Sequence, residues 1–141
     1  MYLESYLKSL PLHQQKSIQE VSKSFSEKLK KTDSKKKIRN TLLLGNVQSG
    51  KTGQVLGLVS SLADENYKFF IYLTTDSVDL QKQTLERVTS SLKEFSVLSE
   101  NDIHNFDDSF RLHKPIIVVL KKNSRILKKW RDTLSSKPYL N

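Results

Sequence analysis

Apolar residues along this chain follow two alternating patterns. Short continuous runs are typical of strands that are covered on both faces. The runs comprise residues 42–44, 69–73 and 116–120. Each run precedes a longer segment whose apolar residues recur at helical spacing, and these segments end near Leu62, Phe95 and Ser135. Strand–helix repeats of this kind predict an α/β fold, with a parallel sheet of about three strands flanked by helices.

The first 32 residues carry two helical stripes separated by a proline. The first stripe comprises Leu3, Tyr6, Leu7 and Leu10, and the second comprises Ile18, Val21, Phe25 and Leu29. Because Pro11 interrupts the pattern, we predict two helices packed on the main domain. The functional alternative is that Tyr2, Tyr6 or Phe25 stacks on a nucleotide base. Residues 30–39 are polar and basic, which favours a solvated linker over a phosphate contact.

Residues 96–114 show no clear periodicity, and we expect a surface excursion anchored by Ile103, Phe106 and Phe110. A metal site is the alternative, because acidic residues and histidines gather in this segment. They are Glu100, Asp102, His104, Asp107, Asp108 and His113. Their spacing does not match the HExxH pattern of zinc enzymes, so the excursion is the favoured interpretation.

Composition and charge restrict the classes of function. The chain has 141 residues, enough for one compact unit with an N-terminal extension, and its formal net charge is +9. A basic excess favours polyanionic partners, of which nucleic acid is the first candidate. The absence of cysteine excludes disulfides, thiolate metal sites and cysteine catalysis. No apolar run approaches the roughly 20 residues of a membrane span, and no signal-peptide core is present, so the cytoplasm is the expected compartment.

The segment between the first apolar run and its helix spells G-x-x-x-x-G-K-T, from Gly45 to Thr52. In this pattern successive backbone N–H groups surround a phosphate at a helix N-terminus. Gly45 and Gly50 lack a Cβ, which permits positive φ and a close approach of the backbone. Lys51 would reach the β- and γ-phosphates, and the Thr52 hydroxyl would coordinate Mg²⁺. A glycine-rich turn with an incidental lysine is the alternative.

This loop predicts a site for ATP and Mg²⁺, with Lys51 and Thr52 as catalytic candidates and Thr52 as the contact to the metal. The expected nucleotide-binding residues are Gly45, Asn46, Val47, Gln48, Ser49, Gly50, Lys51, Thr52 and Gly53. On this basis residues 1–36 form an N-terminal helical extension with a basic linker, and residues 37–141 form a partial P-loop NTPase domain.

Parallel strands end at one edge of their sheet, and open α/β sheets bind ligands there. We therefore expect the P-loop, the Thr74-Thr75 loop and the loop of residues 121–123 to be neighbours. A helix with a basic face follows the third strand, which makes Lys121, Lys122 and Arg125 candidate contacts to nucleic acid. The alternative is that this basic face is only solvated.

Three segments resemble, in order, the first motor domain of superfamily-two helicase-like ATPases. They are GNVQSGKT, LTTDSVDLQKQTLERV and KPIIVVLKKNSRILKKW. The likeness is closest to the bacterial Z-one domain proteins, which are endonuclease- or restriction-associated ATPases. Their P-loop commonly contains V-Q-S-G-K-T, as residues 47–52 do here, and their second motif contains L-x-x-Q-T-x-x-R, as residues 80–87 do. The resemblance covers residues 41–134 and implies a RecA-like fold.

The resemblance also implies ATP-driven activity on DNA, for example within a restriction or phage-defence system. In this family the loop after the second strand contacts the nucleic-acid backbone. Carried over by position, that role falls to Thr75, with Gln83 and Arg87 nearby on the following helix. The loop of this chain is one residue longer between the threonine and Leu80 than the family pattern.

Hydrolysis in this class needs an acidic pair at the end of a further apolar strand. That strand and the arginine fingers of a second motor domain do not occur in the sequence. We therefore expect an N-terminal piece of a longer protein, which binds nucleotide weakly alone and does not hydrolyse it efficiently. Its partners would be the remainder of the parent protein or other subunits. Unpaired strand edges would also favour self-association.

Two other classes of function remain open. A small-molecule kinase or GTPase also uses a P-loop, although the sequence has no N-K-x-D guanine signature and no arginine-rich lid. A nucleic-acid-binding module that holds nucleotide without turnover is the other possibility.

Overall fold

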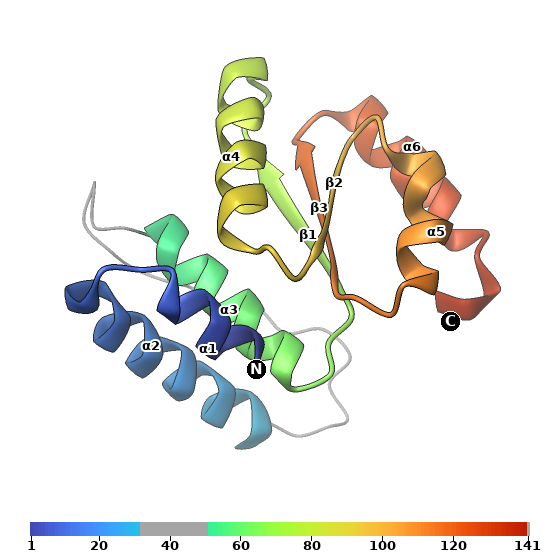
Figure 1. Cartoon of the computed structure of the whole chain (residues 1–141). Coiled ribbons are helices and arrows are strands. Elements are labelled where there is room, and N and C mark those ends of the chain that lie inside the picture. The colour runs from blue at the N-terminus through green and yellow to red at the C-terminus, as the bar shows by residue number, and fades with distance from the viewer. Residues whose placement is uncertain (32–50, 141) are drawn as a thin grey trace. The chain divides into compact units, whose positions relative to one another are not determined.

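The computed structural model describes residues 1–31 and 51–140 (Figure 1). The chain divides into two compact units, Met1–Asn66 and Tyr67–Asn141. The strand predicted at residues 42–44 and the domain boundary predicted after residue 36 both fall outside the described residues. None of the helices in the described part of the chain combines the length and the apolar composition that a bilayer crossing requires.

The first unit contains three described helices, α1 (Tyr2–Lys8), α2 (Leu12–Lys31) and α3 (Lys51–Asp64). The predicted break at Pro11 is confirmed, because it separates α1 from α2. Both of these helices pack against α3. The buried apolar residues of this unit are Tyr6, Leu7, Ile18, Leu56 and Ala63.

Small residues let the helices of this unit approach closely. A Cβ built on Gly57 of α3 would lie 2.4 Å from Cγ2 of Ile18 and 3.1 Å from the Ser22 hydroxyl oxygen. Farther along the same pair of helices, the hydroxyls of Ser26 and Ser61 are hydrogen-bonded at 2.7 Å. The contact between α2 and α3 therefore has no room for a side chain at Gly57.

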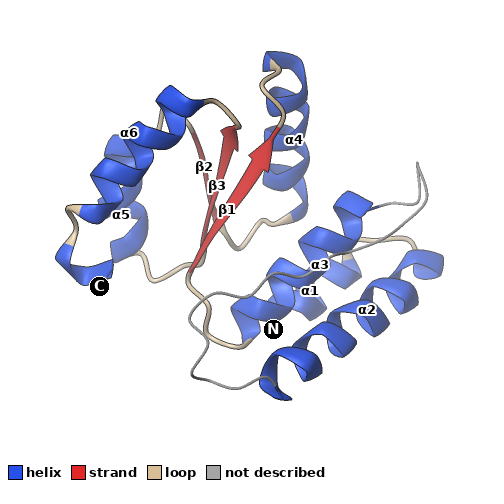
Figure 2. Ribbon diagram, turned by 180° about the vertical axis from the view of Figure 1, so that it is seen from behind, coloured by secondary structure: helices blue, strands red, loops and turns tan. Residues whose placement is uncertain are grey.

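The second unit contains a parallel sheet of three strands, β1 (Phe69–Thr74), β2 (Ser96–Ser99) and β3 (Ile116–Lys121). Their order is β1-β3-β2, so β3 lies in the centre (Figure 2). Every residue of β3 from Ile116 to Leu120 is buried. The strand predicted from the apolar run 116–120 is thus confirmed. The run 69–73 also forms a strand, but the prediction that it is covered on both faces is wrong, because Ile71 and Leu73 of the edge strand β1 are exposed.

Helices cover both faces of this sheet. The helix α4 (Val78–Ser91) lies on one face, and α5 (Phe106–Arg111) and α6 (Ser124–Ser135) lie on the other (Figures 1 and 2). The core on the α5–α6 face comprises Leu98, Phe106, Ile116, Val118, Leu120 and Trp130. Val88, Leu92 and Phe95 are buried at and beyond the end of α4, and the rings of Phe95 and Phe70 are 6.1 Å apart. The predicted α/β fold with a small parallel sheet flanked by helices is therefore present, although only two of its three strands, β1 and β3, are ones that the sequence predicted.

The expectation for residues 96–114 is wrong, because the segment is an integral part of the fold. It contains β2, which pairs in parallel with β3, and α5, whose Phe106 has no exposed surface. Ile103 and Phe110 pack against the same core, as expected of anchors. The strand escaped prediction because it has only 4 residues and begins and ends with serine.

Two helix boundaries also differ from the prediction. The helix expected to reach Phe95 ends at Ser91, and the chain then turns into β2. The helix expected from Lys121 begins at Ser124, because Lys121 is the last residue of β3 and Asn123 caps the helix.

The outer edge of β1 has no partner strand among the described residues. Ile71 and Leu73 on this strand are about half exposed, at 50% and 48%. Self-association through such an edge stays a prediction.

Replacement of Gly57 by alanine tests the close packing of the first unit. On an open helix surface this change stabilises a protein by about 0.5–1 kcal/mol. Here the new methyl would meet the stiff γ-methyl of Ile18, so we expect the free energy of unfolding to fall by about 1–3 kcal/mol. Urea denaturation measures this difference.

The double substitution Gly57→Ala/Ile18→Ala provides the control. Alanine at position 18 removes the obstructing γ-methyl. The stability losses of the two single variants, Gly57→Ala and Ile18→Ala, should therefore sum to more than the stability loss of the double variant. A Gly57→Ala protein more stable than the parent would contradict the close contact.

Candidate functional site

The described part of the predicted P-loop is the first turn of α3. Lys51 is exposed, Thr52 is half-buried and Gly53 is buried. The rest of the predicted loop, residues 45–50, lies outside the described part of the chain.

Two side chains from the N-terminal helices contact this turn. The Tyr6 hydroxyl donates to the carbonyl oxygen of Gly53 at 3.0 Å, and the Gln54 side-chain amide donates to the Ser17 hydroxyl at 3.1 Å. Tyr6 is only 3% exposed. Its ring is therefore part of the core, which excludes it from stacking on a base in this arrangement.

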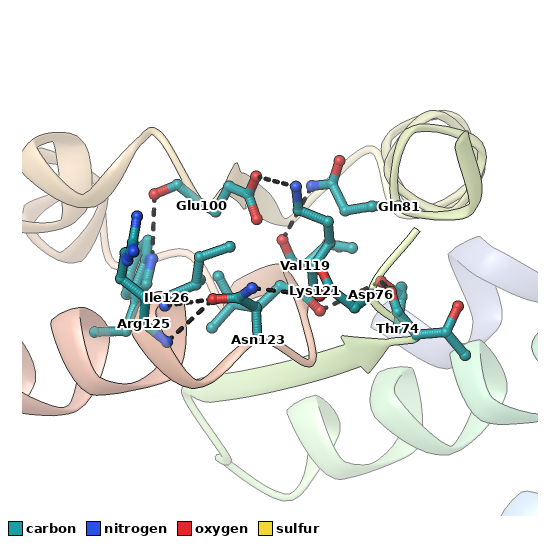
Figure 3. Close-up of polar contacts among 12 residues, drawn as sticks. Thr74, Asp76, Gln81, Glu100, Val119, Lys121, Asn123, Arg125 and Ile126 are labelled. Atoms are coloured by element: carbon teal, nitrogen blue, oxygen red, sulfur yellow. Dashed lines mark hydrogen bonds and ion pairs between the residues drawn. The ribbon is translucent and has the colours of Figure 1, made fainter. Parts of the chain in front are cut away.

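The second candidate region is the carboxyl edge of the sheet (Figure 3). Thr74 and Lys121 are opposite each other at the ends of β1 and β3. The backbone N–H of Lys122 donates to the carbonyl oxygen of Thr74 at 2.8 Å, and the Asn123 amide donates to the Asp76 carboxylate at 3.3 Å. These two loops are neighbours, as predicted from the parallel topology, whereas the third predicted neighbour, the loop of residues 45–50, lies outside the described residues.

Helix caps fix both loops at this edge. Asn123 caps α6, since its side-chain oxygen accepts from the N–H groups of Arg125 at 3.0 Å and Ile126 at 3.3 Å. Ser77 caps α4 by accepting from the N–H of Leu80 at 3.4 Å. Asn123 thus caps the start of α6, and its side-chain amide also binds Asp76 in the loop that leads into α4.

The Lys121 side chain is mostly buried at the carboxyl edge of the sheet and forms an ion pair there. Its ammonium group lies 3.2 Å from a carboxylate oxygen of Glu100, and the two side chains are 17% and 16% exposed (Figure 3). The indole N–H of Trp130 donates to the Glu100 carbonyl oxygen at 3.2 Å. The second carboxylate oxygen of Glu100 is buried without a hydrogen-bond partner in the described structure. Lys121 therefore neutralises a nearly buried charge.

A glutamine supports the same edge from α4. The Gln81 amide donates to the carbonyl oxygen of Val119 at 3.4 Å, and the residue is 9% exposed. This bond joins the first turns of α4 to the central strand.

The other predicted nucleic-acid contacts are exposed. Lys122 and Arg125 lie beside the β3 loop, and Thr75 follows the end of β1. Gln83 and Arg87 are exposed on α4, where a spacing of four residues places them on one face. The structure thus leaves the predicted contacts accessible except Lys121.

The acidic residues of the segment 96–114 do not converge on one point. Glu100 pairs with Lys121, Asp102 accepts from the N–H and hydroxyl of Ser99, and Asp108 lies 3.7 Å from Arg111. Among the residues that the structure describes, no three acidic or histidine side chains lie close enough to hold a metal ion.

Asp107 anchors the last described residues of the chain. It accepts hydrogen bonds from Lys137, at 2.8 Å, and from the Tyr139 hydroxyl. The hydrogen bond from Lys137, and to a smaller extent that from Tyr139, lowers the pKa of the Asp107 carboxyl. The hydrogen bond to Asp107 in turn raises the pKa of Lys137. The rings of Tyr139 and Phe110 lie 4.4 Å apart beside this cluster. Its polar groups satisfy one another.

Comparison with family profiles, with curated proteins and with solved structures found no match to this chain.

The sequence did not predict the contacts of four residues that organise the two regions. They are Tyr6, Gln81, Glu100 and Asn123. Asn123 was detectable, because an asparagine between a strand and an amphipathic stretch is a common helix cap. The other three act through contacts between distant parts of the chain, for which the sequence has no local signal.

Substitution of two adjacent lysines tests the role of the ion pair. Lys121→Ala would leave the Glu100 carboxylate nearly buried and unpaired, so we expect a loss of about 1–3 kcal/mol in the free energy of unfolding. Lys122→Ala, on an exposed neighbour, should change it by less than about 0.5 kcal/mol. Urea denaturation of both variants checks this, and equal effects would show that the pair is not structural.

Proposed function

We propose that this chain binds Mg·ATP through residues 45–52, as the nucleotide-binding part of a helicase-like, DNA-dependent ATPase. The observation that carries the proposal is the sequence G-x-x-x-x-G-K-T, which continues into α3. Each fixed position of this pattern has a role in holding phosphates, and the helix after it matches the context that the pattern requires.

The described residues are compatible with this assignment. Lys51 is exposed at the first position of α3, where its charge would meet the β- and γ-phosphates. Thr52 is adjacent, and its hydroxyl would bind the Mg²⁺ that accompanies the nucleotide. The glycines at positions 45 and 50 would let the backbone approach the phosphates.

Nucleic acid is the proposed partner of the sheet edge. Thr75, Lys122 and Arg125 are exposed around two loops that hydrogen bonds and helix caps hold together. Gln83 and Arg87 present a further polar face on α4. The net charge of +9 supports the same choice, because neutralised phosphates release counterions. Lys121 is the exception, and we assign it a structural role.

The kinase and GTPase alternatives receive less support. Their substrates do not require a surface of lysine and arginine beside the sheet edge, whereas a nucleic-acid backbone does. A module that binds nucleotide and nucleic acid without turnover shares both proposed sites with the ATPase. Hydrolysis that depends on DNA would distinguish the ATPase from such a module.

Calorimetric titration with Mg·ATP and a non-hydrolysable analogue tests the nucleotide site. The parent chain should bind saturably, and Lys51→Ala should bind at least about tenfold more weakly, since a charged hydrogen bond contributes about 1.5–3 kcal/mol. Lys82→Ala, an exposed lysine on α4, is the control and should bind like the parent. Equal binding by the Lys51 and Lys82 variants would refute the assignment.

The salt dependence of DNA binding tests the sheet edge. Affinity should fall with salt, and loss of Lys122 or Arg125 should reduce the slope of log K against log salt by about 1. The Lys121→Ala slope should equal that of the parent, because its charge is already paired with Glu100. Fluorescence anisotropy with a labelled oligonucleotide measures these slopes, and an unchanged slope for Lys122→Ala and Arg125→Ala would exclude this surface.

A further inference from the structure

The helix α1 contacts α3 at both of its ends. The backbone N–H groups of Tyr2 and Leu3 donate to the Asp64 carboxylate at 2.7 and 3.1 Å, in the last turn of α3. The Tyr6 hydroxyl donates to the Gly53 carbonyl oxygen, in the first turn. The helix α1 therefore runs antiparallel to α3 and is tied to it along nearly its whole length.

The contact at Tyr6 is buried and sterically defined. The ring is 3% exposed, and a Cβ on Gly57 would lie 3.7 Å from its Cε1 atom. A buried phenol requires a hydrogen-bond partner, and the Gly53 carbonyl oxygen provides it. The ring position thus determines which backbone oxygen the hydroxyl reaches.

The bonded carbonyl belongs to the turn that carries the proposed phosphate ligands. Gly53 follows Lys51 and Thr52 directly. Glycine has a lower helix propensity than every residue except proline. A second bond, from Gln54 to Ser17 of α2, holds the next residue. These two bonds restrain a turn that its own sequence would leave soft.

We infer that Tyr6 is a positioning residue for the proposed nucleotide site. Its hydroxyl holds the first turn of α3 so that Lys51 and Thr52 are preorganised for phosphate. The inference rests on the proposed function. On this inference the helices α1 and α2 contribute to nucleotide affinity, although they precede the P-loop in the sequence and lie outside its motif.

The test compares Tyr6→Phe with Ser26→Ala. Tyr6→Phe removes only the hydroxyl that reaches Gly53. Ser26→Ala removes one hydrogen bond from the same group of helices, but at Ser61, toward the other end of α3. Urea denaturation would establish that both variants are folded and how much stability each loses. Ser17→Ala, which removes the bond to Gln54, is a further variant with the same expected direction if Tyr6→Phe fails to fold.

Calorimetry would then compare Mg·ATP with Mg·ADP for each variant. Tyr6→Phe should weaken Mg·ATP binding about three- to tenfold, the range expected for one hydrogen bond, and should weaken Mg·ADP binding less. The ratio of the two affinities is informative, because partial unfolding lowers the apparent affinity for both nucleotides by the same factor. Ser26→Ala should leave that ratio unchanged.

The possible failures are distinguishable. If Lys51→Ala loses binding while Tyr6→Phe keeps the parental affinity ratio, the nucleotide site stands and the role of Tyr6 is refuted. If the parent chain binds no Mg·ATP, or Lys51→Ala binds like the parent, the proposed function fails and the inference about Tyr6 fails with it.

Discussion

Burial of β3 on both faces is the constraint on which the second unit depends. Its apolar residues from Ile116 to Leu120 are each at most 1% exposed, and fully burying one such side chain contributes about 1.5–3 kcal/mol. This burial requires helices on both sides of the strand and a neighbour at each edge. The neighbours are β1 and β2, and their parallel pairing brings the end of β1 beside the end of β3. The clustered loops at the sheet edge follow from that pairing.

The first unit depends on a different constraint, the close contact of helices at Gly57. Because the position has no side chain, Ile18 of α2 reaches the backbone of α3 there, and the Tyr6 ring packs beside the same residue. One turn earlier in α3, the Tyr6 hydroxyl donates to the carbonyl oxygen of Gly53, next to the proposed phosphate ligands. Packing in this unit and the proposed chemistry are therefore linked through the first turn of α3.

The elements that the sequence predicted well are those whose signal is local. The runs at residues 69–73 and 116–120 are apolar without interruption, and Pro11 breaks a helix wherever it occurs inside one. The strand β2 was missed because its identity comes from pairing with β3, whose residues lie about 20 positions later in the chain. The acidic residues suggested a metal site for a similar reason, since only the fold shows that Glu100 faces Lys121 and Asp107 faces Lys137.

The two candidate regions differ in how far they were predictable. The neighbouring loops after β1 and β3 followed from parallel topology, and the structure contains them. The ion pair that withdraws Lys121 from solvent was not predictable, because it joins the last residue of β3 to Glu100, which follows β2. The phosphate contacts of residues 45–50 remain a prediction from the motif alone.

The most direct test of the central claim uses the glycines. The chain has 4 glycines, at positions 45, 50, 53 and 57, so selective ¹⁵N-glycine labelling gives one amide signal for each. If the loop binds phosphate, Mg·ATP should shift the signals of Gly45 and Gly50 strongly, because their N–H groups would adjoin the phosphates. Gly57, packed against Ile18, should shift little. Unchanged signals for Gly45 and Gly50 at saturating Mg·ATP would contradict the account.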